Sequence, residues 1–536
     1  MSAATQYFDP GEVMRWESMA LPYLFERPTL DLDRIALVFE GKTRTYGQLR
    51  DNARRVANAL AAEGIQALDR VALLASNMLE FIEIEVGIAM ARGIMVPLNW
   101  RLRKSELVTL LCRTEARVLL VEDRFQHTVR QIIDEGAVPS LQRVVVIGRP
   151  DGSSSHTYAP VGYAAWLAVS SEERLDRGCV LSDPHEIIFT SGTTGRPKGA
   201  IWTNGTVMFN ALQQVLDFGL TKDHSCYVQI DLYYIGGRHD FTWALLYQGG
   251  TVHIKRSSGF DAESVVKYVV AEGITHVLWV PTMLYDIVRL SDLATWDTAR
   301  LRMIMCGGAP VPRWTIEQAQ DLMPETLFVQ VYGLTEGGGT VAFLPPRHAL
   351  DKLGSAGVAS MHNRIRVIDG DGVDCPPNQL GEILVSGPSV TAGYWGEPEL
   401  TAQVVMDGWL HTGDQGYLDD DGFLFIAGRS KDMIISGGMN IFPAEIEDVL
   451  SQHPAVAAVA VVGEADERWG ETVCAAVQLV GGAACTDQEL VEYCKDRLAA
   501  YKKPRRIVFV DSLPRTASGK IQKFVLRSEL AADGVA

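Results

Sequence analysis

The chain has 536 residues, which is too long for one hydrophobic core, so we expect two or more domains. Hydrophobic residues make up 47% of it and charged residues 21%, as in ordinary globular proteins. The formal net charge of −17 argues against nucleic acid as a partner and against stable attachment to an anionic membrane, because both need clustered Lys and Arg.

The first residues, 1–11, carry no basic region that leads into an apolar stretch, so we expect no signal peptide. No apolar run reaches the length that spans a bilayer. The eight cysteines are scattered without a C-x-x-C pair, which predicts reduced thiols rather than a metal site or a disulfide framework. These features predict a cytoplasmic protein without a transmembrane segment.

Helices and strands alternate in the N-terminal part of the chain. Thr45-Tyr-Gly-Gln48 has the form of a capping box, and the helix that it opens can end at Gly64 in a left-handed cap. A second apolar helix is predicted at residues 79–91. Apolar runs predict strands at residues 71–75, 94–97, 118–121 and 144–147. This alternation predicts a doubly wound α/β sheet, which binds ligands at the carboxyl ends of its strands.

A loop rich in glycine and hydroxyl residues follows the next predicted strand, residues 187–189. It reads Thr-Ser-Gly-Thr-Thr-Gly-Arg-Pro-Lys-Gly over residues 190–199. Inward-pointing N–H groups, hydroxyls and an ammonium can together wrap a polyphosphate. The loop is not a Walker loop, because Pro197 stands where that pattern needs glycine. The alternative interpretation is an ordinary surface loop.

The strongest candidate for a domain boundary lies at residues 428–432, where a charged Arg-Ser-Lys-Asp run follows an apolar strand. Beyond it the pattern predicts a helix at about 444–452, strands at 456–462 and 473–480, a helix at 487–499 and a strand at 507–510. These elements make a compact α+β unit of the size of a small domain.

Four further motifs follow the glycine-rich loop. They are Val-Gln-Val-Tyr-Gly-Leu-Thr-Glu at 329–336, Trp-Leu-His-Thr-Gly-Asp at 409–414, Gly-Arg-Ser-Lys-Asp at 428–432 and Pro-Arg-Thr-Ala-Ser-Gly-Lys at 514–520. Together with the loop, and in this order, they resemble the signature of the adenylate-forming superfamily, and in particular of its AMP-forming acyl-CoA synthetases. In looser form the resemblance extends back to Thr45, so it covers nearly the whole chain.

The resemblance implies a fold and a reaction. The fold is a large N-terminal α/β domain of doubly wound sheets with a β-barrel-like portion (residues 1–428), a hinge (429–432) and a small mobile α+β lid (433–536). The carboxylate of a small acid attacks the α-phosphate of ATP, which gives an acyl-adenylate and pyrophosphate, and the thiol of CoA then displaces AMP. The implied metal is Mg²⁺. The resemblance leaves open whether the protein forms a homodimer.

Site residues are also implied by the resemblance. The residues expected to hold the β- and γ-phosphates are Thr190, Ser191, Gly192, Thr193, Thr194, Gly195 and Lys198. Those expected around adenine are Tyr332 and Gly333, with Gly307, Gly308 and Ala309 lining the other side. Asp414 and Arg429 are expected to bind the ribose.

The reacting groups are implied in the same way. Thr335 is expected to contact the α-phosphate, and Glu336 is expected to hold Mg²⁺, which prefers oxygen ligands. Lys520 is the expected catalytic lysine, because its ammonium can bridge the carboxylate and the α-phosphate. Lys431 marks the hinge. The glycine pair Gly437 and Gly438 is expected to line the tunnel for the pantetheine arm of CoA.

The candidate acid pocket is aromatic and roomy, which suits a hydrophobic aryl or medium-to-long-chain acid. Its expected lining is Tyr233, Tyr234, Gly236, Met283 and Gly337. Tyr234 replaces the histidine of the Pro-Leu-Phe-His segment that many acyl-CoA synthetases carry. Amino-acid-activating relatives usually have Asp there, so an amino acid is disfavoured unless the alignment slips to Asp231. Core packing explains the same lining residues without a pocket.

Two neighbouring residues leave several interpretations open. His239, beside Arg238, is either a gate, a group that binds a polar substituent, or half of a surface pair.

The leading functional hypothesis is an acid:CoA ligase, and the alternative is a stand-alone adenylation enzyme that loads a carrier protein in trans. A luciferase-like oxidase is disfavoured, because Ile435 stands where luciferases carry a lysine. A non-enzymatic binding role is disfavoured, since the motif residues are intact.

Overall fold

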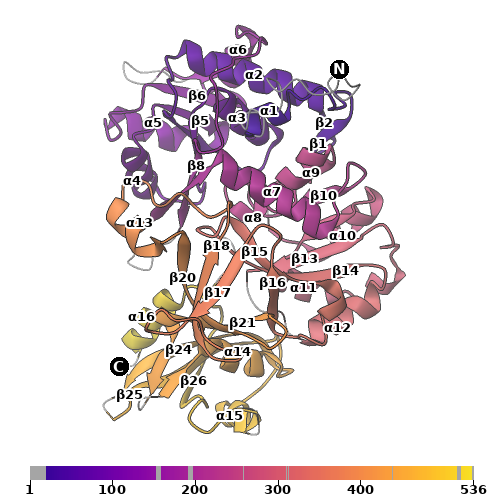
Figure 1. Cartoon of the computed structure of the whole chain (residues 1–536), viewed down its shortest axis with the longest axis vertical. Coiled ribbons are helices and arrows are strands. Elements are labelled where there is room, and N and C mark those ends of the chain that lie inside the picture. The colour runs from indigo at the N-terminus through magenta and orange to yellow at the C-terminus, as the bar shows by residue number, and fades with distance from the viewer. Residues whose placement is uncertain are drawn as a thin grey trace, which may run out of the picture.

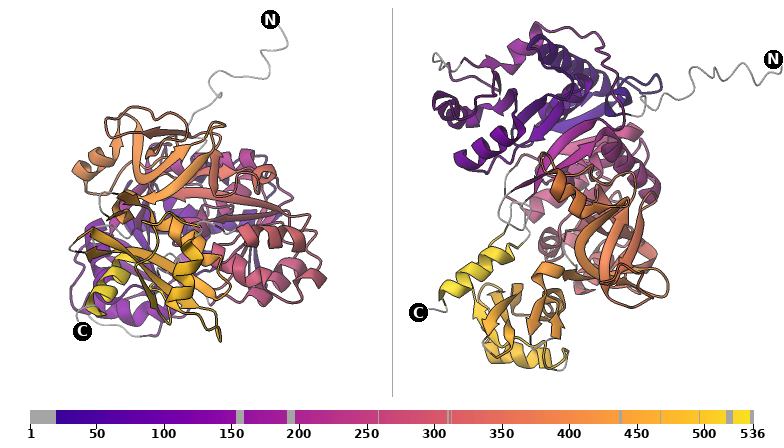
Figure 2. Two further views of the ribbon diagram at one scale, coloured as in Figure 1. Left: turned by 90° about the horizontal axis from the view of Figure 1, so that it is seen from below. Right: turned by 60° about the vertical axis from the view of Figure 1, so that its left-hand side comes forward.

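The computed structural model describes residues 20–152, 159–190, 197–257, 259–308, 311, 313–436, 439–466, 468–495, 497–515 and 521–533. Three sheets organise these residues: an N-terminal, a central and a C-terminal sheet. Figure 1 shows them stacked along the long axis of the molecule, with the C-terminal sheet at the opposite end from the N-terminal one. The large N-terminal α/β portion and the smaller C-terminal unit are both as expected (Figure 2).

The N-terminal sheet is a doubly wound α/β sheet, as the alternation predicted. Its strands are β3 (Arg70–Leu74), β4 (Ile94–Pro97), β5 (Val118–Glu122), β6 (Arg143–Ile147), β7 (Val161–Gly162), β8 (Pro184–Thr190) and β9 (Lys198–Thr203). They lie in the order β7–β6–β5–β3–β4–β8–β9, parallel except for β9, which is antiparallel to β8. Its helices are α2 (Tyr46–Ala62), α3 (Leu79–Met90), α4 (Lys104–Thr114), α5 (Gln126–Asp134) and α6 (Tyr163–Ala168), with the 3-10 turn η3 (Asp123–Phe125).

Local signals position these first helices. The predicted capping box is present at α2, where the Thr45 hydroxyl accepts from the N–H of Gln48 and the Gln48 side chain accepts from the N–H of Thr45. Gly64 follows the helix with a φ of 80°, in the left-handed region that glycine tolerates. α3 is buried over nearly its whole length, as an apolar run between two sheets requires.

The central sheet begins with a parallel half. Its strands are β1 (Ile35–Phe39), β2 (Lys42–Thr45), β10 (Ser225–Val228), β11 (Thr251–Ile254), β12 (His276–Leu278), β13 (Met303–Gly307) and β14 (Leu327–Leu334). They run in the order β2–β1–β11–β10–β12–β13–β14, and only β2 is antiparallel to its neighbour. Its helices and turns are α1 (Leu21–Leu24), α7 (Asn204–Phe218), α8 (Ile235–Arg238), α9 (Thr242–Gln248), α10 (Ala262–Ala271), α11 (Pro281–Val288), η4 (Leu293–Thr295) and α12 (Arg313–Leu322).

An antiparallel portion continues the central sheet beyond β14. It comprises β15 (Gly339–Leu344), η5 (Pro346–His348), β16 (Ser355–Ala359), β17 (Arg364–Ile368), β18 (Gly381–Ser386), α13 (Pro398–Val404), β19 (Val405–Met406), β20 (Trp409–Leu418) and β21 (Leu424–Arg429). The order is β14–β15–β16–β21–β20–β18–β17. These strands enclose their own apolar cluster, which includes Val341, Ile383 and Leu424.

The C-terminal unit is α+β, as predicted. It comprises η6 (Ser430–Asp432), β22 (Ile434–Ser436), β23 (Met439–Ile441), α14 (Pro443–Ser451), β24 (Val456–Asp466), β25 (Gly470–Leu479), α15 (Asp487–Lys495), β26 (Arg506–Phe509) and α16 (Lys523–Asp533). α15 is shorter than the predicted helix at residues 487–499, and the two long strands β24 and β25 pair over ten register positions. Separate apolar clusters line its sheet, so this unit has its own core.

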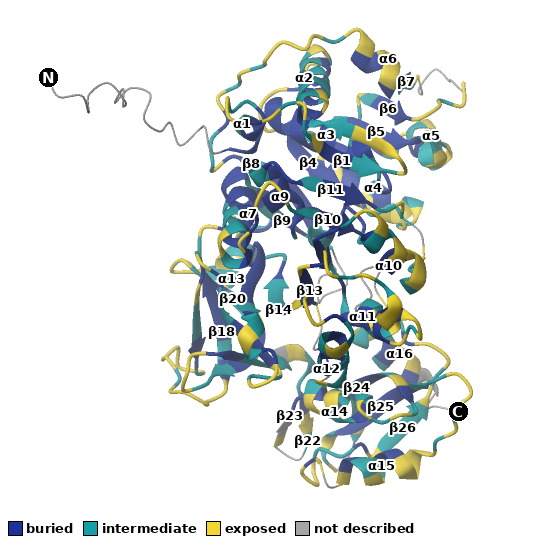
Figure 3. Cartoon of the chain, turned by 90° about the vertical axis from the view of Figure 1, so that its right-hand side faces the viewer, coloured by how far each residue is buried: buried dark blue, intermediate teal, exposed yellow. Residues whose placement is uncertain are grey.

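The main core lies between the N-terminal and central sheets. One cluster joins residues of α2, α3, α7 and α9 with strands of both sheets, and a second packs α10, α11 and α12 against the other face of the central sheet. Figure 3 shows these strands as buried and the outer helix faces as exposed.

The cysteines of the described residues are free thiols, and Cys179, Cys226, Cys306, Cys474 and Cys494 are buried. Within the described ranges, none of the helices combines the length and the apolar character needed to cross a membrane.

Candidate active site

The glycine-rich loop is carried by a β-hairpin. β8 and β9 pair antiparallel, and Thr190 lies opposite Lys198 at the base of the loop. The Thr190 hydroxyl donates to Oε1 of Glu336 at 3.5 Å, so the base of the loop contacts the turn after β14. The loop residues Ser191, Gly192, Thr193, Thr194 and Gly195 lie outside the described residues, and their expected phosphate contacts stay predictions.

Tyr394 connects the hairpin to Glu336. Its hydroxyl donates to Oε1 of Glu336 at 2.8 Å, and Nζ of Lys198 lies 5.3 Å from the centroid of its ring. Burial, and then the Glu336 carboxylate, raise the pKa of Tyr394, so its phenol stays protonated and remains a donor. The sequence does not predict Tyr394 as a site residue, because nothing in the local pattern around this position distinguishes it from a core tyrosine.

Tyr332, Asp414 and Arg429 form a second group. Asp414 lies opposite Arg429 in the β20–β21 ladder, and Oδ1 of Asp414 is 3.0 Å from Nε of Arg429. The Tyr332 hydroxyl donates to Oδ2 of Asp414 at 2.6 Å. Burial, and then Asp414, raise the pKa of Tyr332, so this phenol also stays protonated. An ionised carboxylate has about four lone-pair sites, so Asp414 can accept two further hydrogen bonds, as a diol would offer.

The two groups meet through the end of β14, which carries Tyr332 and leads into Thr335 and Glu336. The indole N–H of Trp202 donates to the carbonyl of Thr335 at 2.8 Å, and this tryptophan is fully buried. Gly333 is required here, because a Cβ atom would lie 2.2 Å from the carbonyl oxygen of Gly339. β14 and β15 therefore approach more closely than any other residue type permits.

The glycines expected around adenine lie at the end of β13. Gly307 is its last residue and pairs with Val331 of β14, so it is next to the strand that carries Tyr332. Gly308 follows with a φ of 87°. Ala309 lies outside the described residues.

The residues expected in the acid pocket come from three segments of the chain. Tyr233 and Tyr234 pack on each other with ring centroids 4.4 Å apart, and the Tyr233 hydroxyl accepts from Nη1 of Arg101 at 3.1 Å. Met283 packs against the core cluster beneath α11, and a Cβ at Gly337 would face Leu334 and Val341. Gly236 lies against a small pocket.

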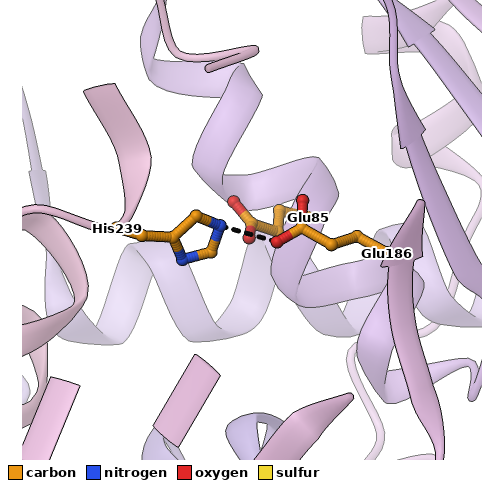
Figure 4. A group of neighbouring side chains, drawn as sticks. All are labelled: Glu85, Glu186 and His239. Atoms are coloured by element: carbon orange, nitrogen blue, oxygen red, sulfur yellow. Dashed lines mark ion pairs between the residues drawn. The ribbon is translucent and has the colours of Figure 1, made fainter. Parts of the chain in front are cut away.

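His239 and Arg238 are fully buried, so the interpretation as a surface pair is wrong. Nε2 of His239 lies 2.6 Å from Oε1 of Glu186 on β8, and Figure 4 shows this pair beside Glu85 of α3. The Arg238 guanidinium pairs with Glu186 and lies 3.2 Å from Oε1 of Glu85. Burial acts to raise the pKa of Glu186, but Arg238 and then His239 outweigh it and hold that pKa below its ordinary value.

This buried ion cluster, Glu85, Glu186, Arg238 and His239, contains three potential metal ligands. The ligand atoms of Glu85, Glu186 and His239 lie within 4.8 Å of one another. The Arg238 guanidinium contacts both carboxylates, and Nε2 of His185 lies 3.1 Å from Oε1 of Glu85, so both carboxylates already have protein partners. The cluster fastens α8 to α3 and to the strand that leads into the glycine-rich loop.

The expected hinge follows Arg429 directly. Lys431 lies in η6, which directly follows the last strand of the antiparallel portion and begins the C-terminal unit. Gly437 and Gly438, between β22 and β23, lie outside the described residues, as does Lys520. On either side of the segment that contains Lys520, Arg515 and Ile521 form an antiparallel bridge.

Comparison with known proteins identifies relatives along the whole chain. The family model for AMP-binding enzymes matches residues 24–395, and the model for their C-terminal domain matches residues 445–520. A feruloyl-CoA synthase from an Amycolatopsis species is 38% identical over 91% of this chain and 94% of its own length. A fatty acid–[acyl-carrier-protein] ligase, ScoC, from Streptomyces coeruleorubidus is 35% identical over 93% and 94%. The structure of the anthranilate CoA ligase AuaEII with anthranoyl-AMP superimposes with a TM-score of 0.87 at 27% identity, covering 96% of this chain and 98% of that one.

Proposed function

Since the chain belongs to the AMP-binding enzyme family and is an AMP-forming acid–thiol ligase, we propose that it activates an aromatic carboxylic acid with ATP and transfers the acyl group to CoA. The observation that carries the proposal is the junction at the end of β14. There Glu336 joins the base of the glycine-rich loop, and Tyr332 joins the Asp414–Arg429 pair.

In the first half-reaction, an oxygen of the acid attacks the α-phosphorus of ATP, and the bond to the β-phosphate oxygen breaks. Two anions must approach each other, so fixed positive charge and N–H donors are expected to dominate catalysis. Lys198 and the loop from Thr190 to Gly195 hold the β- and γ-phosphates, and Thr335 contacts the α-phosphate. Lys520 bridges the carboxylate and the α-phosphate.

The nucleoside is held by the second group. Asp414 accepts the ribose hydroxyls with its two remaining lone-pair sites, and Arg429 keeps that carboxylate ionised and oriented. Tyr332 and Gly333 lie against one face of adenine, and Gly307, Gly308 and Ala309 against the other. The tight β14–β15 approach at Gly333 keeps this face rigid.

The residues around Glu336 suit Mg²⁺. The Glu336 carboxylate and the Thr190 hydroxyl are oxygen donors 3.5 Å apart, the ligand chemistry that this ion prefers. When bound, Mg²⁺ neutralises charge on the phosphates. Tyr394 holds Oε1 of Glu336 in place for this role.

In the second half-reaction, the thiol attacks the acyl carbon and AMP leaves. We propose that the chain divides at residues 429–432, with Lys431 at the hinge, into an N-terminal domain (1–428) and a lid (433–536). Rotation there withdraws Lys520 and brings Gly437 and Gly438 to the path of the pantetheine arm. Their small size permits close approach of that arm.

An aromatic acid is favoured over a fatty acid by two considerations. The feruloyl-CoA synthase and the anthranilate ligase share the fold along nearly their whole length with this chain, and both names specify aromatic acids. The adjacent rings of Tyr233 and Tyr234, which are tilted by 39° to each other, precede Gly236 in the chain and offer aromatic surface there.

Transfer to a carrier protein is the second candidate function. It is favoured by the similarity to ScoC, whose name specifies an acyl-carrier-protein acceptor. Both candidates share the adenylation step and differ only in the thiol.

The experiment that tests the proposal measures AMP release from ATP and Mg²⁺ over a panel of aromatic and fatty acids, with CoA, with a carrier protein, or with no thiol. CoA-stimulated AMP release with aromatic acids is expected. Stimulation by the carrier protein alone contradicts CoA as the acceptor, and turnover with fatty acids alone contradicts the aromatic assignment.

A further inference from the structure

A small pocket opens at the carboxyl edge of the central sheet. Its lining comprises Cys226, Tyr227, Val228, Gln229, Ile230, Gly236, Asp240, Phe241 and Leu278. The free volume is comparable to that of a single water molecule, so the pocket suits the tip of a ligand rather than a whole ring. Most of the lining is apolar, and Asp240 and Gln229 are the polar side chains that interrupt it.

Asp240 is a half-buried carboxyl group with one weak partner. The Thr340 hydroxyl lies 3.4 Å from its Oδ1, at the long end of the hydrogen-bond range. A Cβ built on Gly236 would lie 3.6 Å from Oδ2, so this oxygen faces the pocket beside Gly236. Among the described lining residues, Asp240 carries the only acidic side chain. Burial raises the pKa of this group to about 7, while the Thr340 hydroxyl acts weakly in the opposite direction.

Gln229 supplies an independent observation. Both polar atoms of its side-chain amide, Oε1 and Nε2, are buried and have no hydrogen-bond partner among the described residues. A buried amide without hydrogen-bond partners costs free energy. The presence of Gln229 at this position therefore indicates that a bound ligand supplies the missing hydrogen bonds. Because Gln229 and Asp240 line the same pocket, one ligand group can satisfy both.

The backbone beside Asp240 is strained. Phe241, the next residue, has a φ of 64°, a conformation that bulky residues rarely adopt. Its N–H donates to Oε1 of Gln214 at 2.9 Å, which helps to hold the segment. Strain of this kind persists where the surrounding structure fixes it, and it gathers at binding sites.

The pocket is connected to the segment of the reacting groups through the central sheet and through Thr340. Leu278 ends β12, and β13 and β14 are the next two strands. Leu278 is level with Met305 and Val329 across the sheet, so with strands about 4.8 Å apart it lies roughly 10 Å from Val329, three residues before Tyr332 on β14. Thr340, the partner of Asp240, follows Glu336 by four positions.

We propose that Asp240 and Gln229 form the polar end of the acid-binding pocket and select acids whose ring carries a hydrogen-bond donor, such as a phenolic hydroxyl or an N–H group. The inference rests on the proposed function, because it takes the acid to extend from the α-phosphate toward Gly236. A phenol donates to the Asp240 carboxyl and accepts from the Gln229 amide, so both lining groups gain partners. An acid without the donor leaves both unsatisfied.

The test uses matched pairs of acids: cinnamic with 4-hydroxycinnamic acid, and benzoic with 4-hydroxybenzoic acid. ATP–pyrophosphate exchange measures kcat/KM for each, so the result does not depend on which thiol accepts the acyl group. The wild-type enzyme is expected to prefer the hydroxylated member by about 10- to 100-fold, as for a hydrogen bond to a charged group. Asp240→Asn and Gln229→Met should each reduce this ratio severalfold or more.

Asp217→Asn is the matched control, since Asp217 lies on α7 and accepts from the Met361 N–H outside the pocket. In Asp217→Asn, the ratio of kcat/KM for the hydroxylated acid to kcat/KM for the unsubstituted acid should equal that of wild type. A wild-type enzyme without preference for the donor, or a ratio unchanged in both pocket variants, overturns the inference. Donor-dependent exchange without CoA-stimulated turnover overturns the CoA ligase and leaves the inference standing. No exchange with any acid of the panel overturns both.

Discussion

At the scale of single residues, the candidate site is held together by hydroxyl groups that donate to carboxylates. Tyr394 donates to Glu336 and Tyr332 donates to Asp414, and burial keeps both phenols protonated. Each carboxylate is thereby fixed in one orientation before a ligand arrives. Such partners matter because they orient the group that binds the ligand.

Replacing Tyr394 with Phe removes one of these donors while keeping the ring near Lys198. We expect Tyr394→Phe to raise the Mg²⁺ concentration that gives half-maximal ATP–pyrophosphate exchange by about 10- to 100-fold. Tyr417→Phe on β20 is the control, because the Tyr417 ring stacks on Phe425 away from Glu336. An unchanged Mg²⁺ requirement in Tyr394→Phe contradicts the supporting role.

Asp240 makes stability depend on pH. Its pKa is about 7 in the folded state and 3.8 ordinarily, so the folded state binds the proton more tightly. The stabilisation from this proton is complete below about pH 4 and is lost as the pH rises through about 7. Asp240→Asn should therefore be more stable than wild type at pH 8, by on the order of 2–4 kcal/mol, with a smaller difference at pH 5. Thermal melting at both pH values tests this, and a difference that does not change with pH contradicts it.

At the scale of elements, β8 links two parts of the site. Its last residue, Thr190, begins the glycine-rich loop, and Glu186 within it joins the buried ion cluster that holds α8. α8 in turn precedes Asp240 and carries Gly236. One strand thus sets the position of the loop and of the segment that lines the small pocket.

Breaking the buried ion cluster should cost more than breaking a surface pair. Glu186→Gln removes the buried carboxylate that both Arg238 and His239 contact, so we expect a loss of about 3–5 kcal/mol in the free energy of unfolding. Glu263→Gln on α10 removes an exposed pair with Lys267 and should cost no more than about 1 kcal/mol. Urea unfolding compares the two variants. Equal losses would contradict a structural role for the cluster.

Sequence pattern predicts elements well where the signal is local. The capping box at Thr45 and the apolar run of α3 specify their helices from neighbouring residues alone, and both helices are present. α15 ends before the predicted position, since periodicity fixes helix ends poorly. Tyr394, Gln229 and Asp240 were not predicted as site residues. Tyr394 and Asp240 contact residues far along the chain, the Gln229 amide has no partner among the described residues, and no local pattern marks any of the three.

At the scale of the whole molecule, the fold brings distant motifs to one junction. Thr190, Glu336 and Tyr394 come from three segments and meet at Oε1 of one carboxylate. The motif order in the sequence predicted which segments matter, because a family signature carries information that composition does not. The roles assigned to these residues, and the hinge at residues 429–432, remain predictions.

Because the two half-reactions are assigned to different positions of the lid, we expect that one substitution can abolish the first half-reaction and spare the second. Lys520→Ala should abolish adenylation, because no other cation is expected to bridge the carboxylate and the α-phosphate, yet leave thioester formation from synthetic acyl-AMP largely intact. Lys495→Ala, which removes an exposed partner of Glu492 on α15, should affect neither. Equal loss of both half-reactions in Lys520→Ala would contradict this division.

The most direct test of the acyl-adenylate route is isotope transfer from the acid. The enzyme is incubated with ATP, Mg²⁺, CoA and an aromatic acid labelled with ¹⁸O in its carboxylate, and the masses of the products are measured by mass spectrometry. Attack on the α-phosphorus predicts AMP with one ¹⁸O atom and unlabelled pyrophosphate. Unlabelled AMP, or label in a free phosphate formed with ADP, would contradict the account.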